Sequence, residues 1–253
     1  MDLGLQDRVA LVTGSSQGIG RSVAELMSKE GARVAITYRQ HEQQATDLAD
    51  AISAQGGQAT VISYDLDSAD SIRRSVEHVI SKWGRLDILV NNAIEFGARS
   101  IADSPLLENW PEEEWRMLLR CNLEGAFLTT QCVVPHMRRQ KWGRIVNVSS
   151  TVATDGQPGS AWYGMAKAGL NGFTSSLYKE LGPFGILVNS VLPAPTRTQR
   201  VSGVRPEILQ HLAKQTALNR LLDPSDVANT IVFLCSAINT GITGAVIRIG
   251  GGS

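Results

Sequence analysis

The sequence predicts an α/β fold, in which helices cover both faces of a parallel sheet. Short β-branched runs alternate with longer segments of helical period along the 253 residues, which is typical of βαβ units. No internal repeat, low-complexity tract or shift in composition divides the chain, so we expect one domain, 1–253, around one core. Right-handed crossovers between successive strands then distribute the helices over both faces.

Seven runs are predicted to be strands. In chain order they read RVALVTG, RVAITY, ATVISYD, LDILVNN, GRIVNVSS, GILVNSVLP and GAVIRIGG. Helices are predicted between them at about 18–30, 42–55, 68–83, 111–138, 160–182 and 224–236. The last helix follows Asp223-Pro224, where the aspartate can cap the helix and proline is tolerated in the first turn.

Two segments interrupt this alternation, at about 94–110 and 193–216. Each follows the carboxyl end of a predicted strand, and open α/β sheets bind ligands outside the carboxyl ends of their strands. We therefore expect both segments to be substrate loops that form the walls of one site.

The composition argues against several classes of partner. The chain has 24 basic and 24 acidic side chains and a pI near 6.9, so no overall field attracts nucleic acid or an anionic membrane. No apolar stretch approaches the roughly 18 residues of a membrane span, and MDLGLQDRVALV does not resemble a signal peptide. We expect a cytoplasmic protein. Cys121, Cys132 and Cys235 form no C-x-x-C pair, which favours reduced thiols over a metal site.

A glycine-rich turn follows the first predicted strand and leads directly into a helix. Such a turn lets the backbone approach a pyrophosphate, while the helix N-terminus offers N–H groups and a positive dipole end. The spacing is G-x-x-x-G-x-G, not the commoner G-x-G-x-x-G, and a turn without a ligand is the alternative. The candidate cofactor-binding residues here are Gly14, Ser15, Ser16, Gln17, Gly18, Ile19 and Gly20.

The end of the second strand is expected to select the cofactor. An acidic side chain there binds the ribose 2′-hydroxyl, whereas an arginine neutralises a 2′-phosphate. The strand ends with Arg39 and has no carboxylate before Glu42. This favours NADPH (NADP+), with NADH possible; a solvated arginine is the alternative. Asp65 and Leu66 close the third strand and are candidates to bracket the adenine.

Tyr163 and Lys167 are four residues apart in a predicted helix, in SAWYGMAKAGL. Residues at i and i+4 share a helix face, so the phenol and the ammonium can reach a common point. A nearby positive charge favours the phenolate and lowers the pKa of a tyrosine from about 10. The pair is a candidate acid–base centre, although an isolated Y-x-x-x-K is usually a surface accident.

The ordered set of motifs resembles the short-chain dehydrogenase/reductase family over nearly the whole chain. The matching residues are Thr13-Gly14-x-x-x-Gly18-x-Gly20, Asn91-Asn92-Ala93, Asn122, Ser150, Tyr163-x-x-x-Lys167, Pro193 and Ile242-Thr243-Gly244. The resemblance implies a Rossmann-type, doubly wound, seven-stranded sheet in the order 3-2-1-4-5-6-7 and a nicotinamide cofactor. It further implies a catalytic tetrad of Asn122, Ser150, Tyr163 and Lys167.

The chemistry of a ketone reduction agrees with these residue types. Tyr163 would protonate the developing alkoxide, Lys167 would favour the phenolate and hold the nicotinamide ribose, and Ser150 would orient the carbonyl oxygen. Asn122 would hold a water that links the lysine to solvent, or serve as a kink residue. The resemblance adds Asn92, Ala93, Pro193, Thr196 and Thr198 to the residues that contact the cofactor.

The chain departs from the family pattern in three places. Ile94 replaces a glycine beside the cofactor groove. The next loop is about six residues longer than usual, and its Phe96, Leu106, Leu107 and Trp110 are predicted to wall the substrate pocket, with surface elaboration as the alternative. Pro193-Ala194-Pro195 makes the following turn stiff, so the lid at roughly 199–216 would swing on a less flexible hinge.

Within the family, the resemblance is greatest to 3-oxoacyl-[acyl-carrier-protein] reductases and polyketide ketoreductases. It implies NADPH-dependent reduction of a β-ketoacyl thioester bound to an acyl carrier protein, which docks on basic residues flanking the active site. Lys141, with Arg138 and Arg139 nearby, fills one docking position, but Phe184 stands at the other. The alternatives are a dehydrogenase of a free alcohol or sugar and, more remotely, an inactive nucleotide-sensing scaffold.

The resemblance also implies association into a homotetramer or homodimer. Family members pair through the two long helices after the fourth and fifth strands and through the C-terminal strand. Trp142, Phe173 and Tyr178 are candidates for this surface.

Overall fold

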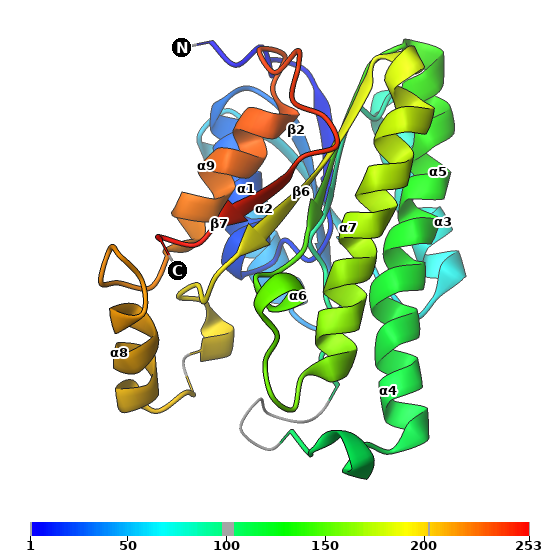
Figure 1. Cartoon of the computed structure of the whole chain (residues 1–253). Helices are drawn as coiled ribbons and strands as arrows, with labels where there is room; N and C mark the ends of the chain where they lie inside the picture. The colour runs from blue at the N-terminus through cyan, green and yellow to red at the C-terminus, as the bar shows by residue number, and fades with distance from the viewer. Residues whose placement is uncertain (1, 98–103, 202, 253) are drawn as a thin grey trace.

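One parallel sheet organises the chain (Figure 1). The structure is a computed structural model that describes all residues except 1, 98–103, 202 and 253. The strand order is β3-β2-β1-β4-β5-β6-β7, which confirms the predicted fold. The strands are β1 (Val9–Val12), β2 (Arg33–Tyr38), β3 (Gln58–Ser63), β4 (Ile88–Asn91), β5 (Gly143–Val148), β6 (Ile186–Pro193) and β7 (Val246–Ile249).

Helices pack on both faces of this sheet (Figure 1). Successive strand side chains point to opposite faces, so Val12 and Ile36 belong to one buried cluster, while Leu11 and Leu89 belong to the other. The first cluster is completed by α1 (Gly18–Lys29), α2 (Glu42–Ala54) and α9 (Pro224–Cys235). The second is completed by α3 (Ala69–Trp83), α5 (Gly125–Gln140) and α7 (Ala161–Leu181).

The predicted helix at 111–138 is not continuous. It consists of α4 (Glu112–Leu119), a π-helical turn (Arg120–Glu124) and α5. A π turn inserts one extra residue into a helix and is frequent at functional sites. Asn122 lies in the middle of this turn, so the turn sets where its side chain is directed.

The segment expected to be a lid contains a helix that the prediction missed. It is α8 (Pro206–Lys214), which has proline in its first turn, Glu207 near its start and Lys214 at its end, all of which are helix signals. Shorter elements were also missed, namely α6 (Val152–Asp155) and single 3-10 turns at Leu107–Asn109, Gly182–Phe184 and Gln199–Val201.

The parallel register brings the ends of five strands to one edge of the sheet. The glycine-rich turn follows β1, Arg39 follows β2, Asn92 follows β4, Ser149 follows β5, and Pro193 ends β6. This edge is where an open α/β sheet binds ligands. None of the helices in the described part of the chain has the length and apolar character that crossing a bilayer requires.

Candidate active site

The glycine-rich turn packs tightly against the chain that follows β4. Gly14 and Gly18 have φ values of +63° and +59°, a left-handed conformation that favours glycine. A Cβ on Gly14 would lie 2.9 Å from Ala93 Cα, and one on Gly20 would lie 2.5 Å from Asn92 Nδ2. Glycine is therefore required for this turn to pack as it does.

Hydrogen bonds from polar side chains hold the turn in place. Thr13 Oγ1 accepts from the N–H groups of Asn92 and Ala93, both at 2.9 Å, and Asn92 Nδ2 donates to the carbonyl of Gly14 at 3.0 Å. The Ser15 hydroxyl donates to Val12 O at 2.7 Å and accepts from Thr37 N at 2.9 Å, while Ser15 N donates to Thr37 O. The side-chain amide of Asn92 and both donors of Ser15 are thus used inside the protein.

The start of α1 is suited to a dinucleotide phosphate. The helix begins at Gly18 after an extended Gln17, and its first turn carries no acidic side chain, so the positive end of the helix dipole is not neutralised. Ser16 is buried, and Ile19 packs on the core cluster. The residues present therefore fit a pyrophosphate beside the turn.

Arg39 is in contact with a residue that the sequence argument did not single out. Its guanidinium forms an ion pair with the carboxylate of Glu95, which lies beyond the end of β4.

Asp65 and Leu66 lie just past β3, which ends at Ser63, two residues earlier than predicted. Asp65 Oδ1 accepts from Asp67 N at 3.0 Å.

Leu66 packs closely against Gly125, the first residue of α5. A Cβ on Gly125 would lie only 2.6 Å from Leu66 Cδ2. This contact places the turn after β3 beside the start of α5. Asp65 and Leu66 therefore fix the junction of β3, α3 and α5 in addition to any contact with a cofactor.

Tyr163 and Lys167 lie on one face of α7. Lys167 Nζ is 5.8 Å from the centre of the Tyr163 ring and donates a hydrogen bond to Val148 O at 2.7 Å. The lysine side chain is buried, and burial lowers the pKa of Lys167 to about 8. The ammonium is therefore held at the end of β5, close to the phenol that it is expected to influence.

The two serines after β5 have different environments. Ser149 Oγ donates to the main-chain carbonyl of Lys167 at 2.8 Å, which ties α7 to the end of β5. Ser150 Oγ accepts from Val152 N at 3.2 Å and is nearly buried. Ser149 is thus engaged with the helix backbone, whereas the Ser150 hydroxyl retains its hydrogen for another partner.

Asn122 uses its side chain to bind the loop after β4. Its Nδ2 donates to Glu95 O and to Leu118 O, both at 2.7 Å, and its Oδ1 accepts from Glu95 N at 2.9 Å. Both amide hydrogens are therefore engaged with the protein backbone. The side chain thus supports the π turn, which is the alternative role considered for Asn122, and a water held at this residue stays a prediction.

The segment after β6 lies beside the glycine-rich turn. Pro193 O accepts from Thr151 N at 3.2 Å. Thr196 is buried, its hydroxyl donates to Ala194 O at 2.8 Å, and its backbone pairs with Leu222. A Cβ on Gly18 would lie 3.3 Å from Thr198 Cγ2. The structure thus brings Thr198 to the turn, while the Thr196 hydroxyl is turned to its own backbone.

Aromatic side chains surround the phenol of Tyr163. The ring of Phe96 lies 5.5 Å from that of Tyr163, and Trp162 lies 5.6 Å from Tyr163 and 6.3 Å from Trp110. Phe96 and Trp110 belong to the long loop, and their role as a pocket wall stays a prediction. Leu106 and Leu107 are instead 61% and 73% exposed. Residues 98–103 of this loop lie outside the described residues.

A buried polar network at the carboxyl ends of β4 and β5 was not anticipated. Asn91 Nδ2 donates to Asn147 Oδ1 at 2.9 Å and to Thr130 Oγ1 at 3.1 Å, and Asn147 Nδ2 donates to Thr174 Oγ1 at 2.9 Å. These groups join β4, β5, α5 and α7. An asparagine near the end of each of two buried strands was the available signal, since buried amides require partners.

The basic residues considered for carrier docking lie at the other end of the long helices. Arg138 and Arg139 are in the last turn of α5, and Arg138 pairs with Glu180 at 2.7 Å near the end of α7. Tyr163 is at the start of α7, about 25 Å away at 1.5 Å per residue. Within one chain, therefore, Arg138, Arg139 and Lys141 do not flank the active site.

Two of the three aromatic residues expected at a subunit surface are engaged within the chain. The guanidinium groups of Arg8 and Arg144 lie 3.9 and 4.3 Å from the centre of the Trp142 ring. The Tyr178 ring lies against Gly244, where a Cβ would be 2.5 Å away. Phe173 instead pairs with Phe127, which is 50% exposed, at 5.4 Å.

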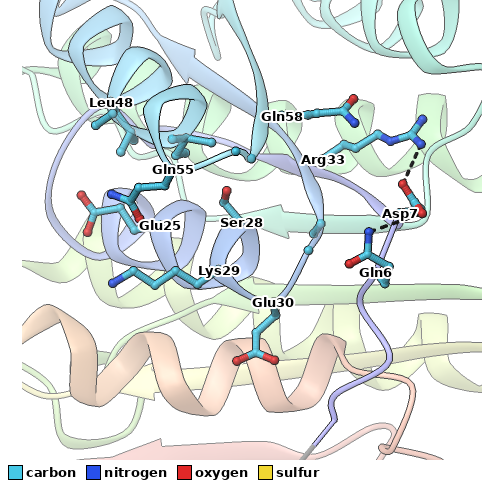
Figure 2. A pocket seen from close by; sticks show the side chains of 16 residues that line it. Gln6, Asp7, Glu25, Ser28, Lys29, Glu30, Arg33, Leu48, Gln55 and Gln58 are labelled. Atoms are coloured by element: carbon cyan, nitrogen blue, oxygen red, sulfur yellow. Dashed lines mark hydrogen bonds and ion pairs between the residues drawn. The ribbon is translucent and has the colours of Figure 1, made fainter.

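A large cavity lies at the opposite, amino edge of the sheet. It has a volume of about 700 Å³, and Arg33, Gln58, Lys29 and Gln55 are among its lining residues (Figure 2). These residues mark the starts of β2 and β3 and the ends of α1 and α2. The side chains brought together around Tyr163 do not line this cavity, so cavity size alone does not locate the active site.

Comparisons with known proteins agree over nearly the whole chain. The family model described as enoyl-(acyl carrier protein) reductase matches residues 14–253. The chain is 39% identical over 252 residues to the 3-oxoacyl-[acyl-carrier-protein] reductase FabG of Aquifex aeolicus (strain VF5), covering 100% of this chain and 99% of that protein. It is 36% identical over 250 residues to the 3-oxoacyl-[acyl-carrier-protein] reductase of Synechocystis sp. (strain ATCC 27184 / PCC 6803 / Kazusa), covering 98% and 97%.

Solved structures show the same similarity. A 7α-hydroxysteroid dehydrogenase complexed with NADH and 7-oxo glycochenodeoxycholic acid superposes with a TM-score of 0.92 at 29% identity, covering 100% of this chain and 96% of that one. A dehydrogenase/reductase from Sinorhizobium meliloti 1021 has a TM-score of 0.89 at 30% identity, covering 99% and 96%. Sequence and structure together make this chain an oxidoreductase of the short-chain dehydrogenase/reductase family, which uses a nicotinamide cofactor.

Proposed function

We propose that the protein is an NADPH-dependent ketoreductase that reduces a β-ketoacyl thioester, carried by an acyl carrier protein, to the β-hydroxyacyl product. The observation that carries this proposal is the pairing of Tyr163 with a buried Lys167 at the carboxyl edge of the sheet. Identities of 36–39% to 3-oxoacyl-[acyl-carrier-protein] reductases support the substrate class.

Three side chains perform the proton chemistry in this proposal. Ser150 donates its free hydroxyl hydrogen to the substrate carbonyl oxygen and so orients the carbonyl. Tyr163 gives its phenolic proton to the same oxygen as charge develops there. The nearby Lys167 ammonium stabilises the phenolate that remains. A nicotinamide held beside these residues would supply the hydride.

Asn122 has a positioning role in this scheme. Its side chain joins the π turn to the main chain of Glu95, and Glu95 is followed directly by Phe96 of the aromatic wall. The turn therefore fixes the first part of the 94–110 substrate loop relative to Tyr163. Phe96, Trp110 and Trp162 would then pack against the apolar part of the substrate.

NADPH selection is assigned to Arg39. It is 43% exposed at the end of β2, where a guanidinium can bind a 2′-phosphate. The glycine-rich turn, with the N-terminus of α1, would hold the pyrophosphate, and Thr198 would lie beside it. Asp65, Leu66 and Ala93 would enclose the adenosine half, and Pro193 and Thr196 would shape the nicotinamide end.

A substrate panel tests the proposal. Oxidation of NADPH and NADH is followed at 340 nm with a β-ketoacyl thioester, an enoyl thioester, a free ketone and, with NAD+ or NADP+, free alcohols and sugars. We expect NADPH with the β-ketoacyl thioester to give the highest kcat/KM. Highest activity with a free alcohol or sugar would favour the dehydrogenase alternative, and highest activity with the enoyl thioester would assign the reaction named in the description of the family model.

A homo-oligomer through α5 and α7 is part of the proposal. An apolar hollow of about 270 Å³ lies between these helices and is lined by Leu123, Phe127, Leu170, Phe173 and Glu124. A second copy is the proposed occupant, because oligomers are typical of the family. Phe127→Glu is expected to lower the mass measured by light scattering, whereas Ile208→Glu, at an exposed position on α8 away from both helices, should leave it unchanged.

Carrier docking in this proposal uses a second copy of the chain. When two copies pair with α7 antiparallel, Arg139 and Lys141 of one copy approach the Tyr163 end of the other. Arg139→Glu with Lys141→Glu should raise KM at least tenfold for a carrier-bound substrate, because an acidic partner is then repelled. KM for the same acyl group on a small thiol should stay within twofold; an equal rise for both would contradict the docking role.

A further inference from the structure

The Arg39–Glu95 ion pair crosses the mouth of the glycine-rich turn. Arg39 follows β2 and Glu95 follows β4, and β1 lies between these two strands. Neighbouring strands are about 4.8 Å apart, so the two chains are separated by roughly 10 Å at this edge. Side chains that join them must pass over the end of β1, where the turn begins. The pair therefore lies where the adenosine half of a dinucleotide would enter.

Glu95 is the fixed member of this pair. Its side chain is 12% exposed, against 43% for Arg39. Its Oε1 accepts from Gly97 N at 2.7 Å, and its backbone N–H and carbonyl are both bound to Asn122. Glu95 is thus fixed through its main chain by Asn122 and through its carboxylate by Gly97 N, whereas the more exposed arginine is the member that can move to a ligand.

A 2′-phosphate and the Glu95 carboxylate would require the same guanidinium. A phosphate monoester carries about −1.5 to −2 charge at neutral pH, so it must draw Arg39 away from Glu95 and would then lie near an unpaired carboxylate. A ribose without this phosphate does not break the Arg39–Glu95 pair and is not repelled by the carboxylate. Its 2′-hydroxyl can donate a hydrogen bond to that carboxylate. The Glu95 carboxylate therefore disfavours the binding of NADPH and favours the binding of NADH.

We infer that Glu95 is a cofactor-specificity residue that weakens the preference for NADPH conferred by Arg39. The inference rests on the proposed assignment of Arg39 to the 2′-phosphate. In this arrangement Arg39 binds the 2′-phosphate, and Glu95 limits how much more tightly NADPH binds than NADH. NADH binding is preserved because the carboxylate remains available to the ribose.

Direct binding of cofactor to Glu95→Gln tests the inference, with reduced-nicotinamide fluorescence as the readout. The amide keeps an oxygen for Gly97 N but removes the charge. We expect the Kd for NADPH to fall about fivefold to tenfold, while the Kd for NADH stays the same or rises. An unchanged or higher Kd for NADPH would overturn the inference. Glu25→Gln is the matched control, because Glu25 pairs with Arg21 on α1 and lines the cavity at the amino edge.

A double-mutant cycle separates this inference from the assignment on which it rests. Arg39→Gln should raise the Kd for NADPH more than tenfold. In that background Glu95→Gln should improve NADPH binding by a smaller factor than in the wild type, because the guanidinium for which the two groups compete is gone and only the repulsion between carboxylate and phosphate remains. If Arg39→Gln changes the ratio of the two Kd values and Glu95→Gln does not, Glu95 has no role in selection. If Arg39→Gln leaves the ratio unchanged, the phosphate site itself is assigned wrongly. Thermal melting of each variant controls for folding.

Discussion

Lys167 Nζ lies 5.8 Å from the centre of the Tyr163 ring and is hydrogen-bonded to Val148 O at 2.7 Å. The lysine is therefore anchored to the carboxyl end of β5 and is positioned one helical turn from the phenol. Ser149 binds the main-chain carbonyl of the same lysine. The end of β5 thus orients the start of α7, and with it the proposed acid–base pair.

Removal of the phenolic hydroxyl should abolish most turnover. In Tyr163→Phe, kcat is expected to fall by about 10²–10⁴, the usual contribution of a positioned proton donor, while the Kd for NADPH changes less than threefold. Stopped-flow or steady-state kinetics with a fluorescence binding titration measures both. Tyr178→Phe, the same change at the far end of α7, should keep kcat within twofold. Near-normal activity in the Tyr163 variant would contradict the assigned role.

The buried ammonium of Lys167 should make unfolding depend on pH. Burial lowers its pKa from 10.5 to about 8 in the folded protein, so between these values the unfolded chain binds more protons than the folded one. The free energy of unfolding should therefore rise with pH across this window relative to Lys167→Met, by at most about 3 kcal/mol. Urea unfolding of both proteins at pH 7.5, 9 and 10 measures the difference. A difference that is independent of pH would show that the lysine pKa is not lowered.

Replacement of Gly18 should damage cofactor binding more than folding. Its φ is +59°, and an added Cβ would lie 3.3 Å from Thr198 Cγ2, so Gly18→Ala both strains the turn and crowds the segment after β6. We expect the Kd for NADPH to rise at least tenfold and stability to fall by about 1–2 kcal/mol.

Gly84→Ala is the control for backbone strain. Gly84 has a φ of +72° with no atom within 4 Å of an added Cβ, and it caps α3. It should cost similar stability and leave cofactor binding unchanged. Equal loss of cofactor affinity in the two variants would mean that the turn itself does not contact the dinucleotide.

The positions of the strands and of the Tyr163–Lys167 helix were predictable because both depend on local patterns. Strand periodicity located the seven strands, and the family resemblance supplied their order. The helix α8 could also have been predicted from the sequence, since Pro206 and Glu207 are ordinary helix-start signals. It was missed because the segment was interpreted as a lid.

The hydrogen-bond partner of Asn122 and the Arg39–Glu95 ion pair were not predictable. The Asn122 side chain is directed by hydrogen bonds to Glu95, which is 27 residues away in sequence. Arg39 and Glu95 are 56 residues apart in sequence. They are in contact because β2 and β4 flank the same strand, β1, in the sheet. Pairs of this kind depend on topology, which periodicity does not encode.

An ionic cluster around the buried Asp87, at the amino edge of the sheet, should stabilise the fold without affecting catalysis. Asp87 is fully buried and accepts from Arg85 Nη2 at 2.6 Å, Arg8 Nη1 at 3.1 Å and Val9 N at 2.9 Å. Asp87→Ala removes these acceptors and leaves a buried N–H unpaired, so stability should fall by about 3–5 kcal/mol.

Asp87→Asn separates the charge from the hydrogen bond. Its side-chain oxygen can still accept from Val9 N, so we expect a smaller loss of stability, of about 1–2 kcal/mol. In both variants kcat at a permissive temperature should remain within twofold, because the cluster lies at the edge of the sheet opposite Tyr163. Urea unfolding and initial-rate kinetics measure the two properties. A loss of kcat in the folded Asn variant would indicate that the amino edge is coupled to the active site.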